Sequence, residues 1–339
     1  MAQRVIVHIG LMKSGTTFIQ GRLGANRERL AEQGVLFPGP TWRRHVNAVS
    51  DFMEAKERTP GSWESLVEEI NDHPGTAVVS MEYLVMLGPR KIPRLAAAFG
   101  DADVRIVVGA RDLGRTVPAM WQEVIKNRAT WTWAEYLESI RTGGEAGKRF
   151  WRQQHAGRVV TRWADSVGAD HVYLLTLPPP QAPGDVLWDR FREIAGIADG
   201  TWEEAPRSNE SLGVASTLVV RQLNLMTQDL PLKGYKRRVK AVAKHLMPAH
   251  RPQESPIGFT VPEWLTREAA KIRAQIEESG VHVVGDLDDL TPLDVPGVDP
   301  GTVDAGAQRD AALAALEATL RQVNRIKPAP QRTGRRGRG

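Results

Sequence analysis

The sequence predicts an α/β protein in which helices flank a parallel sheet, followed by a mainly helical C-terminal part. Short apolar runs rich in β-branched residues recur along the first half of the chain, and segments with helical periodicity separate them. Such runs are typical of parallel strands that are buried on both faces. Because strands and helices alternate, the helices are expected to cover the faces of one sheet.

The expected elements follow one another in a regular order. Strands are predicted at Val5–Ile9, Ala77–Ser80, Val104–Gly109 and His171–Thr176, and helices at Ser62–Asn71, Lys91–Phe99 and Trp133–Arg141. The carboxyl ends of parallel strands meet at one edge of a sheet, where such sheets bind ligands. Polar residues follow three of the strands at Lys13, Glu82 and Arg111, and we expect them to contribute to one site.

The chain becomes mainly helical from about residue 213. Helices are predicted at Val214–Met226, Pro262–Glu278 and Asp310–Asn324, a late strand or extended segment at 281–287, and a loop at 294–306. The last helix is expected to pack on the body of the protein through its leucine face, which starts at Leu313.

Segment 232–251 is strongly basic and has apolar residues at helical spacing, which predicts a helix with a solvated charged face. A lid over phosphates, an anionic acceptor and contact with a membrane surface are its functional alternatives.

The composition is that of an ordinary globular protein. The chain has 339 residues, of which 41% are hydrophobic and 25% charged, and it contains no cysteine. This excludes disulfides, thiolate metal sites and cysteine nucleophiles. The first expected strand begins close to the N-terminus, and no apolar run approaches the roughly 20 residues that span a bilayer, so a cytoplasmic protein is expected.

The net charge of +5 is unevenly distributed. Residues 327–339 hold five basic residues and no acidic residue among prolines and glycines, which predicts a disordered basic tail. Basic and acidic residues balance in the rest of the chain, so no specific nucleic-acid partner is expected, and weak contact with anionic surfaces stays open. Residues 1–326 are predicted to form a single domain, and the oligomeric state is left open.

The most informative motif lies between Val5 and Thr17. An apolar run enters a loop bounded by Gly10 and Gly15, and a helical pattern begins at Thr16. This is a P-loop-type arrangement, in which backbone N–H groups and the positive end of a helix face an anion. The spacing matches the first half of the motif G-x-x-x-x-G-K-[ST], but Thr16 replaces the lysine, and Lys13 lies inside the loop. The loop therefore favours a shorter anion than a magnesium-bound triphosphate.

The segment Lys13-Ser14-Gly15-Thr16-Thr17 resembles the 5′-phosphosulfate loop of the PAPS-dependent sulfotransferases, and of their soluble bacterial branch, at all five positions. PAPS is 3′-phosphoadenosine 5′-phosphosulfate. The resemblance implies a sulfotransferase that moves a sulfuryl group from PAPS to a hydroxyl or amine and releases PAP, with no metal. These five residues would bind the donor, and Lys13 would also act in catalysis. The acceptor implied is a small molecule, a carbohydrate or a lipid.

Arg111, at the end of a predicted strand, resembles the arginine that binds the 3′-phosphate in this family. The planar guanidinium suits that phosphate. The family has a serine eight residues later, where this chain has Ala119, so that contact does not carry over. Arg115 and Thr116 are the candidate replacements.

A third resemblance covers residues 207–213, which are similar to an Asn-x-Ser-Leu segment of bacterial sulfotransferase-like proteins. It adds Arg207, Asn209 and Ser211 as candidate donor-binding residues. Asn209 or Ser211 is equally suited to cap the helix predicted from Val214.

Two residues are candidates for the base that sulfuryl transfer to a hydroxyl requires. Glu82 lies in Ser80-Met81-Glu82-Tyr83-Leu84, which resembles the Ser-x-Glu-x-Leu segment of bacterial relatives. A carboxylate stabilised by a helix N-terminus is its structural alternative. His45 follows a Pro-Gly loop that is also common in those relatives, and it is expected either to contact the acceptor or to be structural.

Two other functions remain open at this stage. One is a Mg-dependent nucleotide phosphotransferase or hydrolase with an altered P-loop. The other is a noncatalytic protein that binds PAP or another nucleotide, which the serine missing at Ala119 favours. Binding of PAP, ADP and ATP with and without Mg²⁺ would separate them.

Overall fold

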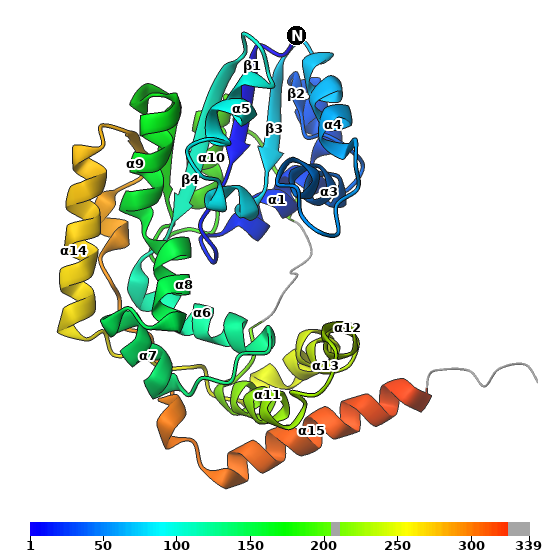
Figure 1. The fold of residues 1–339 in the computed structure, drawn as a ribbon, viewed down its shortest axis with the longest axis vertical. Coiled ribbons are helices and arrows are strands. Elements are labelled where there is room, and N and C mark those ends of the chain that lie inside the picture. Colours follow the sequence, from blue (N-terminus) through cyan, green and yellow to red (C-terminus); the bar gives the residue numbers. More distant parts are fainter. Residues whose placement is uncertain (205–210, 325–339) are drawn as a thin grey trace, which may run out of the picture. The chain divides into compact units, whose positions relative to one another are not determined.

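The computed structural model describes residues 1–204 and 211–324 and contains an all-parallel sheet (Figure 1). Its strands are β1 (Arg4–His8), β2 (Val35–Leu36), β3 (Thr76–Ser80), β4 (Asp103–Ala110), β5 (Val172–Thr176) and β6 (His282–Val284), in the order β2-β3-β1-β4-β5-β6. In central β1, His8 is level with Ser80 of β3 and Val107 of β4. The strand order reverses at β1, so the loop that follows it lies at the switch point where such sheets bind ligands.

Contacts among Cα atoms divide the described chain into two units. The sheet unit comprises residues 1–121, 132–204 and 259–295. Its helices are α1 (Thr16–Ala25), α2 (Arg27–Glu32), α3 (Arg43–Phe52), α4 (Ser62–Asn71), α5 (Ile92–Ala97), most of α6 (Leu113–Lys126), α7 (Trp133–Thr142), α8 (Glu145–Gln154), α9 (Ala156–Val167), α10 (Val186–Ala195) and α14 (Glu263–Glu278), with short 3₁₀ turns η1 (Glu82–Met86), η2 (Ala169–His171) and η4 (Leu287–Leu290). α9 packs on β4 and β5, and α14 and α5 pack on α9.

The main core of the sheet unit lies between one face of the sheet and α1, α2 and α10. Ile6, Val78 and Val107 come from three adjacent strands and are fully buried there with Ile19 and Leu23 of α1. A side chain such as Leu23 contributes roughly 1.5–3 kcal/mol when it is buried. This packing fixes α1 against β1, so the loop between them is held at both ends.

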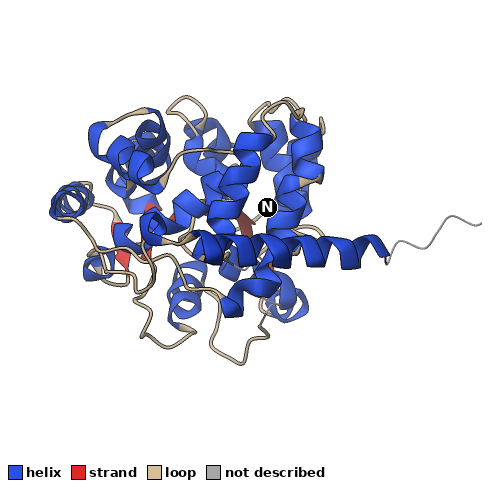
Figure 2. Ribbon diagram, turned by 90° about the horizontal axis from the view of Figure 1, so that it is seen from below, coloured by secondary structure: helices blue, strands red, loops and turns tan. Residues whose placement is uncertain are grey.

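The helical unit comprises residues 122–131, 211–258 and 296–324. Its elements are the last turn of α6, α11 (Val214–Met226), α12 (Leu232–Arg237), α13 (Val239–His245), the 3₁₀ turns η3 (Met247–Gln253) and η5 (Pro300–Thr302), and α15 (Ala305–Asn324). α15, the long helix that runs into the grey trace in Figure 2, packs on α11 and η3.

The predicted fold class is confirmed, with three differences in detail. The basic segment is not one helix, because Arg238 divides it into α12 and α13. α15 begins at Ala305, inside the predicted loop, because the Asp304 carboxylate accepts the Ala307 N–H at 2.8 Å and caps the helix. The predicted packing of its leucine face is wrong. Exposed fractions are 56% for Leu313, 54% for Leu316 and 56% for Leu320, whereas Ala311 on another face is buried.

The predicted tail at 327–339 lies outside the described residues, and the single domain predicted for 1–326 stays a prediction. None of the helices in the described ranges combines the length and apolar character needed to cross a membrane.

Candidate functional site

The loop after β1, residues 9–15, is bonded to the end of β4. Ile9 N–H donates to the Val107 carbonyl at 2.9 Å, and Leu11 N–H donates to the Gly109 carbonyl at 2.8 Å. Lys13 follows with a φ of +69°, a left-handed conformation that is uncommon outside glycine. Strain of this kind persists where surrounding contacts impose it and is frequent at ligand sites. The bonds to β4 and the left-handed backbone at Lys13 therefore fix the conformation of the loop, which leads directly into α1.

Two glycines make this course possible. Gly15 has a φ of +87°, and a Cβ there would lie 2.5 Å from Cδ2 of Leu187 in α10. Gly109 has no positive φ, but a Cβ on it would lie 2.8 Å from Ser14 Oγ. A side chain at either position would displace the loop or the core behind it.

The first turn of α1 faces the loop without a side-chain cap. Gly15 is the N-cap residue, and it has no side chain that could accept a hydrogen bond from the first-turn N–H groups of α1. These groups also lack partners inside the helix by its geometry. Thr16 Oγ1 is buried and has no hydrogen-bond partner among the described residues. This set of donors at the positive end of a helix fits a phosphate or sulfate group.

Two polar side chains, one in the loop and one in α8, hydrogen-bond to backbone carbonyls of the loop. Ser14 Oγ donates to the Leu11 carbonyl at 2.6 Å, so its proton is used inside the loop. Gln154, the last residue of α8, donates from Nε2 to the Met12 carbonyl at 3.0 Å. The sequence reasoning did not find Gln154, because it lies far from the loop in the chain and carries no motif. In this structure Ser14 shapes the loop as well as being a candidate ligand.

Lys13, Glu82 and Arg111 come together at the carboxyl edge of β1, β3 and β4, as predicted from the strand ends. Met81 N–H donates to the His8 carbonyl at 2.9 Å, which places Glu82 beside the end of β1 at the start of η1. Arg111 Nη1 donates to the Lys13 carbonyl at 3.4 Å. All three side chains are partly buried. The edge thus combines a lysine, an arginine and a carboxylate around the loop that follows β1.

The charge of Arg111 is incompletely compensated. The pKa of Arg111 is lowered to about 10, mainly by burial and in part by the charge of Arg115, while Asp112 acts in the opposite direction. Its Nε is buried and has no hydrogen-bond partner among the described residues. A buried guanidinium that still carries its proton at neutral pH favours an anion from outside the chain.

Arg115 is engaged in the structure of α6. Its Nε donates to the Asp112 carboxylate, and its Nη1 donates to the Pro178 carbonyl at 3.1 Å. Asp112 is fully buried, accepts the Arg115 N–H at 2.8 Å and so caps α6. Asp112 is therefore both the ion-pair partner of Arg115 and the cap of α6. Ala119, further along α6, offers no hydroxyl, and Thr116 is buried.

His45 lies beneath this edge rather than at its surface. Its Nε2 donates to the Pro38 carbonyl at 3.1 Å, and its Nδ1 accepts the Ser80 N–H at 3.3 Å. Burial lowers the pKa of His45 to about 4 against the effect of the Pro38 hydrogen bond, so the ring is neutral. Both ring nitrogens therefore join the 38–45 segment to the end of β3.

His8 belongs to the same buried layer. Gln20 Nε2 donates to Ser80 Oγ at 3.2 Å, and Ser80 Oγ lies 2.8 Å from His8 Nδ1. Burial lowers the pKa of His8 to about 3. His8 is fully buried, which agrees with a structural role.

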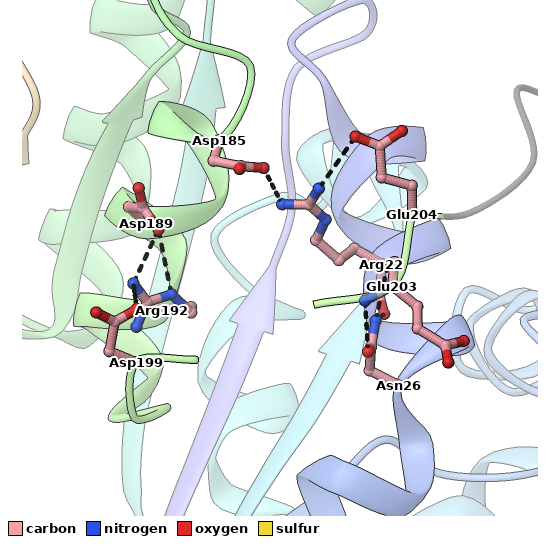
Figure 3. A network of polar contacts seen from close by, with 8 residues as sticks. All are labelled: Arg22, Asn26, Asp185, Asp189, Arg192, Asp199, Glu203 and Glu204. Carbon is pink, nitrogen blue, oxygen red and sulfur yellow. Dashed lines mark hydrogen bonds and ion pairs between the residues drawn. The ribbon is translucent and has the colours of Figure 1, made fainter. Parts of the chain in front are cut away.

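The outer end of α1 is fixed by a second polar network (Figure 3). Arg22 pairs with Asp185, lies 3.8 Å from the Glu204 carboxylate, and stacks over Trp188 at 5.8 Å. Asn26 exchanges two hydrogen bonds of 2.9 Å with the backbone of Glu203. These contacts hold the C-terminal end of α1, opposite its uncapped N-terminus.

The third predicted segment is only partly described. Arg207 and Asn209 lie outside the described residues. Ser211 is exposed at the start of the described part of the helical unit, just before α11. The α11 N-cap position is taken by Gly213, without a side-chain cap. The role of these three residues stays a prediction.

The described residues contain no group of three or more His, Asp or Glu side chains arranged to hold a metal ion. No family model matches the chain, and no curated protein matches it. Among solved structures, it is similar to a sulfotransferase from Alicyclobacillus acidocaldarius, with 16% sequence identity and a TM-score of 0.42. The match covers 61% of this chain and 87% of that protein.

Proposed function

We propose that this protein is a PAPS-dependent sulfotransferase that acts on a hydroxyl or amine acceptor and releases PAP. The observation that carries the proposal is the carboxyl edge of β1, β3 and β4. There an uncapped helix end and the loop with Lys13 adjoin Arg111 on one side and Glu82 on the other. Sulfuryl transfer needs three elements: a site that binds the anionic donor, a cation beside the leaving group, and a base for the acceptor proton.

The donor would be held by the loop and by α1. The N–H groups of Thr16 and Thr17 and the hydroxyl of Thr16 would bind the phosphosulfate, and Arg111 would bind the 3′-phosphate. PAPS supplies the activated sulfuryl group for transfer. Lys13 would stabilise the negative charge that develops on the departing phosphate oxygen, which is typically worth 10²–10³ in rate.

Glu82 is the better placed of the two candidate bases. Glu82 lies partly buried at the start of η1, just after the end of β3, whereas both ring nitrogens of His45 are hydrogen-bonded to backbone groups beneath this edge. A base must be able to reach the acceptor proton, and His45 is fully buried. We therefore assign proton abstraction to Glu82 and a structural role to His45.

Calorimetric titration of the full-length protein tests this proposal directly. PAP should bind without Mg²⁺ and about 10- to 100-fold more tightly than ADP, because a charge-assisted bond to the 3′-phosphate contributes about 1.5–3 kcal/mol. Arg111→Gln should remove this preference. Arg152→Gln is a matched control, since Arg152 is exposed on α8 and makes no ion pair among the described residues.

Each alternative function gives a different result. Equal affinity for PAP and ADP, or binding of ATP that requires Mg²⁺, would favour a phosphotransferase or hydrolase and remove the proposal. Selective PAP binding without sulfuryl transfer to any of a panel of alcohols, sugars and amines would favour a noncatalytic binding protein. That second outcome is credible because Ala119 offers no hydroxyl and Arg115 is engaged with Asp112.

A further inference from the structure

The helical unit carries a group of exposed cations that make no ion pair with any residue in the described part of the chain. Lys233, Lys236, Arg237, Arg238 and Lys244 are exposed, and no carboxylate in the described ranges lies within ion-pairing distance of any of them. Several arginines of the sheet unit are paired with carboxylates instead, as in the pairs of Arg4 with Asp103, Arg44 with Glu69 and Arg190 with Asp289. The positive electrostatic potential of this cluster can therefore attract an anion from solution or from another molecule.

Exposed apolar side chains adjoin the cations in the sequence and in the fold. The exposed fraction is 41% for Leu225, 76% for Met226 and 57% for Leu232. The first two end α11, and Leu232 begins α12 immediately before Lys233. We call residues 225–244 the basic-apolar corner.

The corner is a built structure. Arg128 Nη2 donates to the carbonyls of Thr227, Gln228 and Leu230 at 3.1, 2.6 and 2.7 Å, which fixes the turn between α11 and α12. Tyr235 is buried, and its hydroxyl donates to Asn224 Oδ1 at 2.8 Å. The exposure of Met226 and Leu232 is thus imposed by a turn with a defined backbone.

Side-chain direction separates the inner and outer faces of the corner. Tyr235 of α12 and Val239 and Ala243 of α13 are buried. Lys233, Lys236, Arg237 and Lys244 of the same two helices are exposed and therefore point outward. Burial lowers the pKa of Lys240, Glu123 raises it, and Lys244 and Lys236 lower it. Like charges are therefore crowded on one outer face next to exposed apolar side chains.

We propose that the basic-apolar corner binds the surface of anionic lipid membranes. Clusters of four to eight cations on amphipathic helices recognise anionic lipid headgroups, and adjacent apolar side chains enter the boundary between headgroups and acyl chains. A nucleic acid or a soluble polyanion would use the cations but would leave Met226 and Leu232 in water. The apolar part of the corner therefore favours a lipid surface, independently of the function proposed for the sheet unit.

Flotation of the full-length protein with vesicles tests this inference. The protein should float with vesicles that contain about one third phosphatidylserine and remain unbound with pure phosphatidylcholine. The charge variant K233E/K236E/R237E should weaken binding at least about 100-fold, since each cation near an anionic surface contributes about a factor of five to ten. The apolar variant M226S/L232S should weaken it about 10-fold.

Two controls make the result specific. K56E/K148E changes two exposed lysines of the sheet unit and should leave flotation unchanged. Thermal unfolding and circular dichroism verify that each variant folds. Heparin binding separates the partners, because it should respond to the charge variant and not to M226S/L232S.

Three outcomes would overturn the inference. The first is no flotation with anionic vesicles. The second is flotation that M226S/L232S leaves intact, which would identify the corner as a site for a polyanion. The third is flotation that the charge variant retains but a chain ending at residue 326 loses, which would assign the binding to the basic tail.

Discussion

The carboxyl edge of the sheet has two layers of polar side chains that differ in how they are used. The buried layer contains His8, His45 and Gln154, and their hydrogen bonds join β1 to β3, the 38–45 segment to β3, and α8 to the loop. The outer layer contains Lys13, Glu82 and Arg111, which are partly buried and carry charge. The buried layer can keep the strands and the loop in position, and the outer layer can interact with a charged ligand.

This comparison divides the expected effects of mutation into two classes. Changes in the outer layer should alter binding or turnover and leave the free energy of unfolding nearly unchanged. Changes in the buried layer should alter stability first and function through it, because an unpartnered buried polar group costs about 1–3 kcal/mol.

Glu82→Gln should have the largest effect on turnover. It keeps the size of the side chain but removes its capacity to accept a proton, so turnover should fall by about 10²–10⁴ with PAP affinity near wild type. Transfer of ³⁵S from PAPS to an acceptor, together with calorimetry, measures both quantities. His45→Gln is the comparison in the buried layer, and it should lower stability more than turnover. Near-normal turnover in Glu82→Gln with an inactive but folded His45→Gln would exchange the two roles.

Lys13→Ala should reduce turnover by about 10²–10³, since it removes the cation beside the leaving group. The left-handed backbone at this position costs alanine about as much as lysine, so the loop should keep its course. The unfolding midpoint in urea should therefore stay within the error of the wild type. Full activity in this variant would show that the loop does not bind a reacting group.

The parts of this arrangement that the sequence predicted are those formed by contiguous stretches of the chain. The strands were recognisable because both faces of the sheet are covered and their runs are apolar throughout. Lys13 to Thr17 were recognisable because one loop supplies all of them. β2 has two residues, Val35 and Leu36, which is too short for a pattern.

The buried layer had no comparable signal. His8 and Ser80 are 72 positions apart, and Gln154 and Met12 are 142 apart, so their pairing depends on the fold. The cap at Asp304 was a local signal, but it lay in a segment rich in proline and glycine that predicted a loop. The exposed leucines of α15 illustrate a different limit of sequence-based prediction. Helical periodicity identifies an apolar face but not what covers it.

The buried histidines predict a pH dependence of stability. Their pKa values are lowered from 6.5 to about 3 for His8 and about 4 for His45, by burial in both cases. Below pH 6.5 the unfolded chain therefore binds protons at these positions that the folded protein does not bind, and stability falls as the pH falls. At pH 5 each histidine should cost about 2 kcal/mol relative to pH 7.5. Urea unfolding at the two pH values measures the difference, and equal stability at both would contradict the assignment of His8 and His45 to the buried layer.

Gln154→Leu should have the smallest effect and is the most specific test of the buried layer. It removes the donor to the Met12 carbonyl from α8 while keeping a side chain of similar volume. The free energy of unfolding should fall by about 1 kcal/mol or slightly more, because a buried carbonyl loses its partner. PAP affinity should fall by less than about 10-fold, since ligand binding must then also order the loop. Gln153→Leu is the matched control, as the neighbouring amide makes no hydrogen bond among the described residues. A loss of turnover as large as that of Lys13→Ala, with unchanged stability, would move Gln154 into the outer layer and make it a ligand-binding residue.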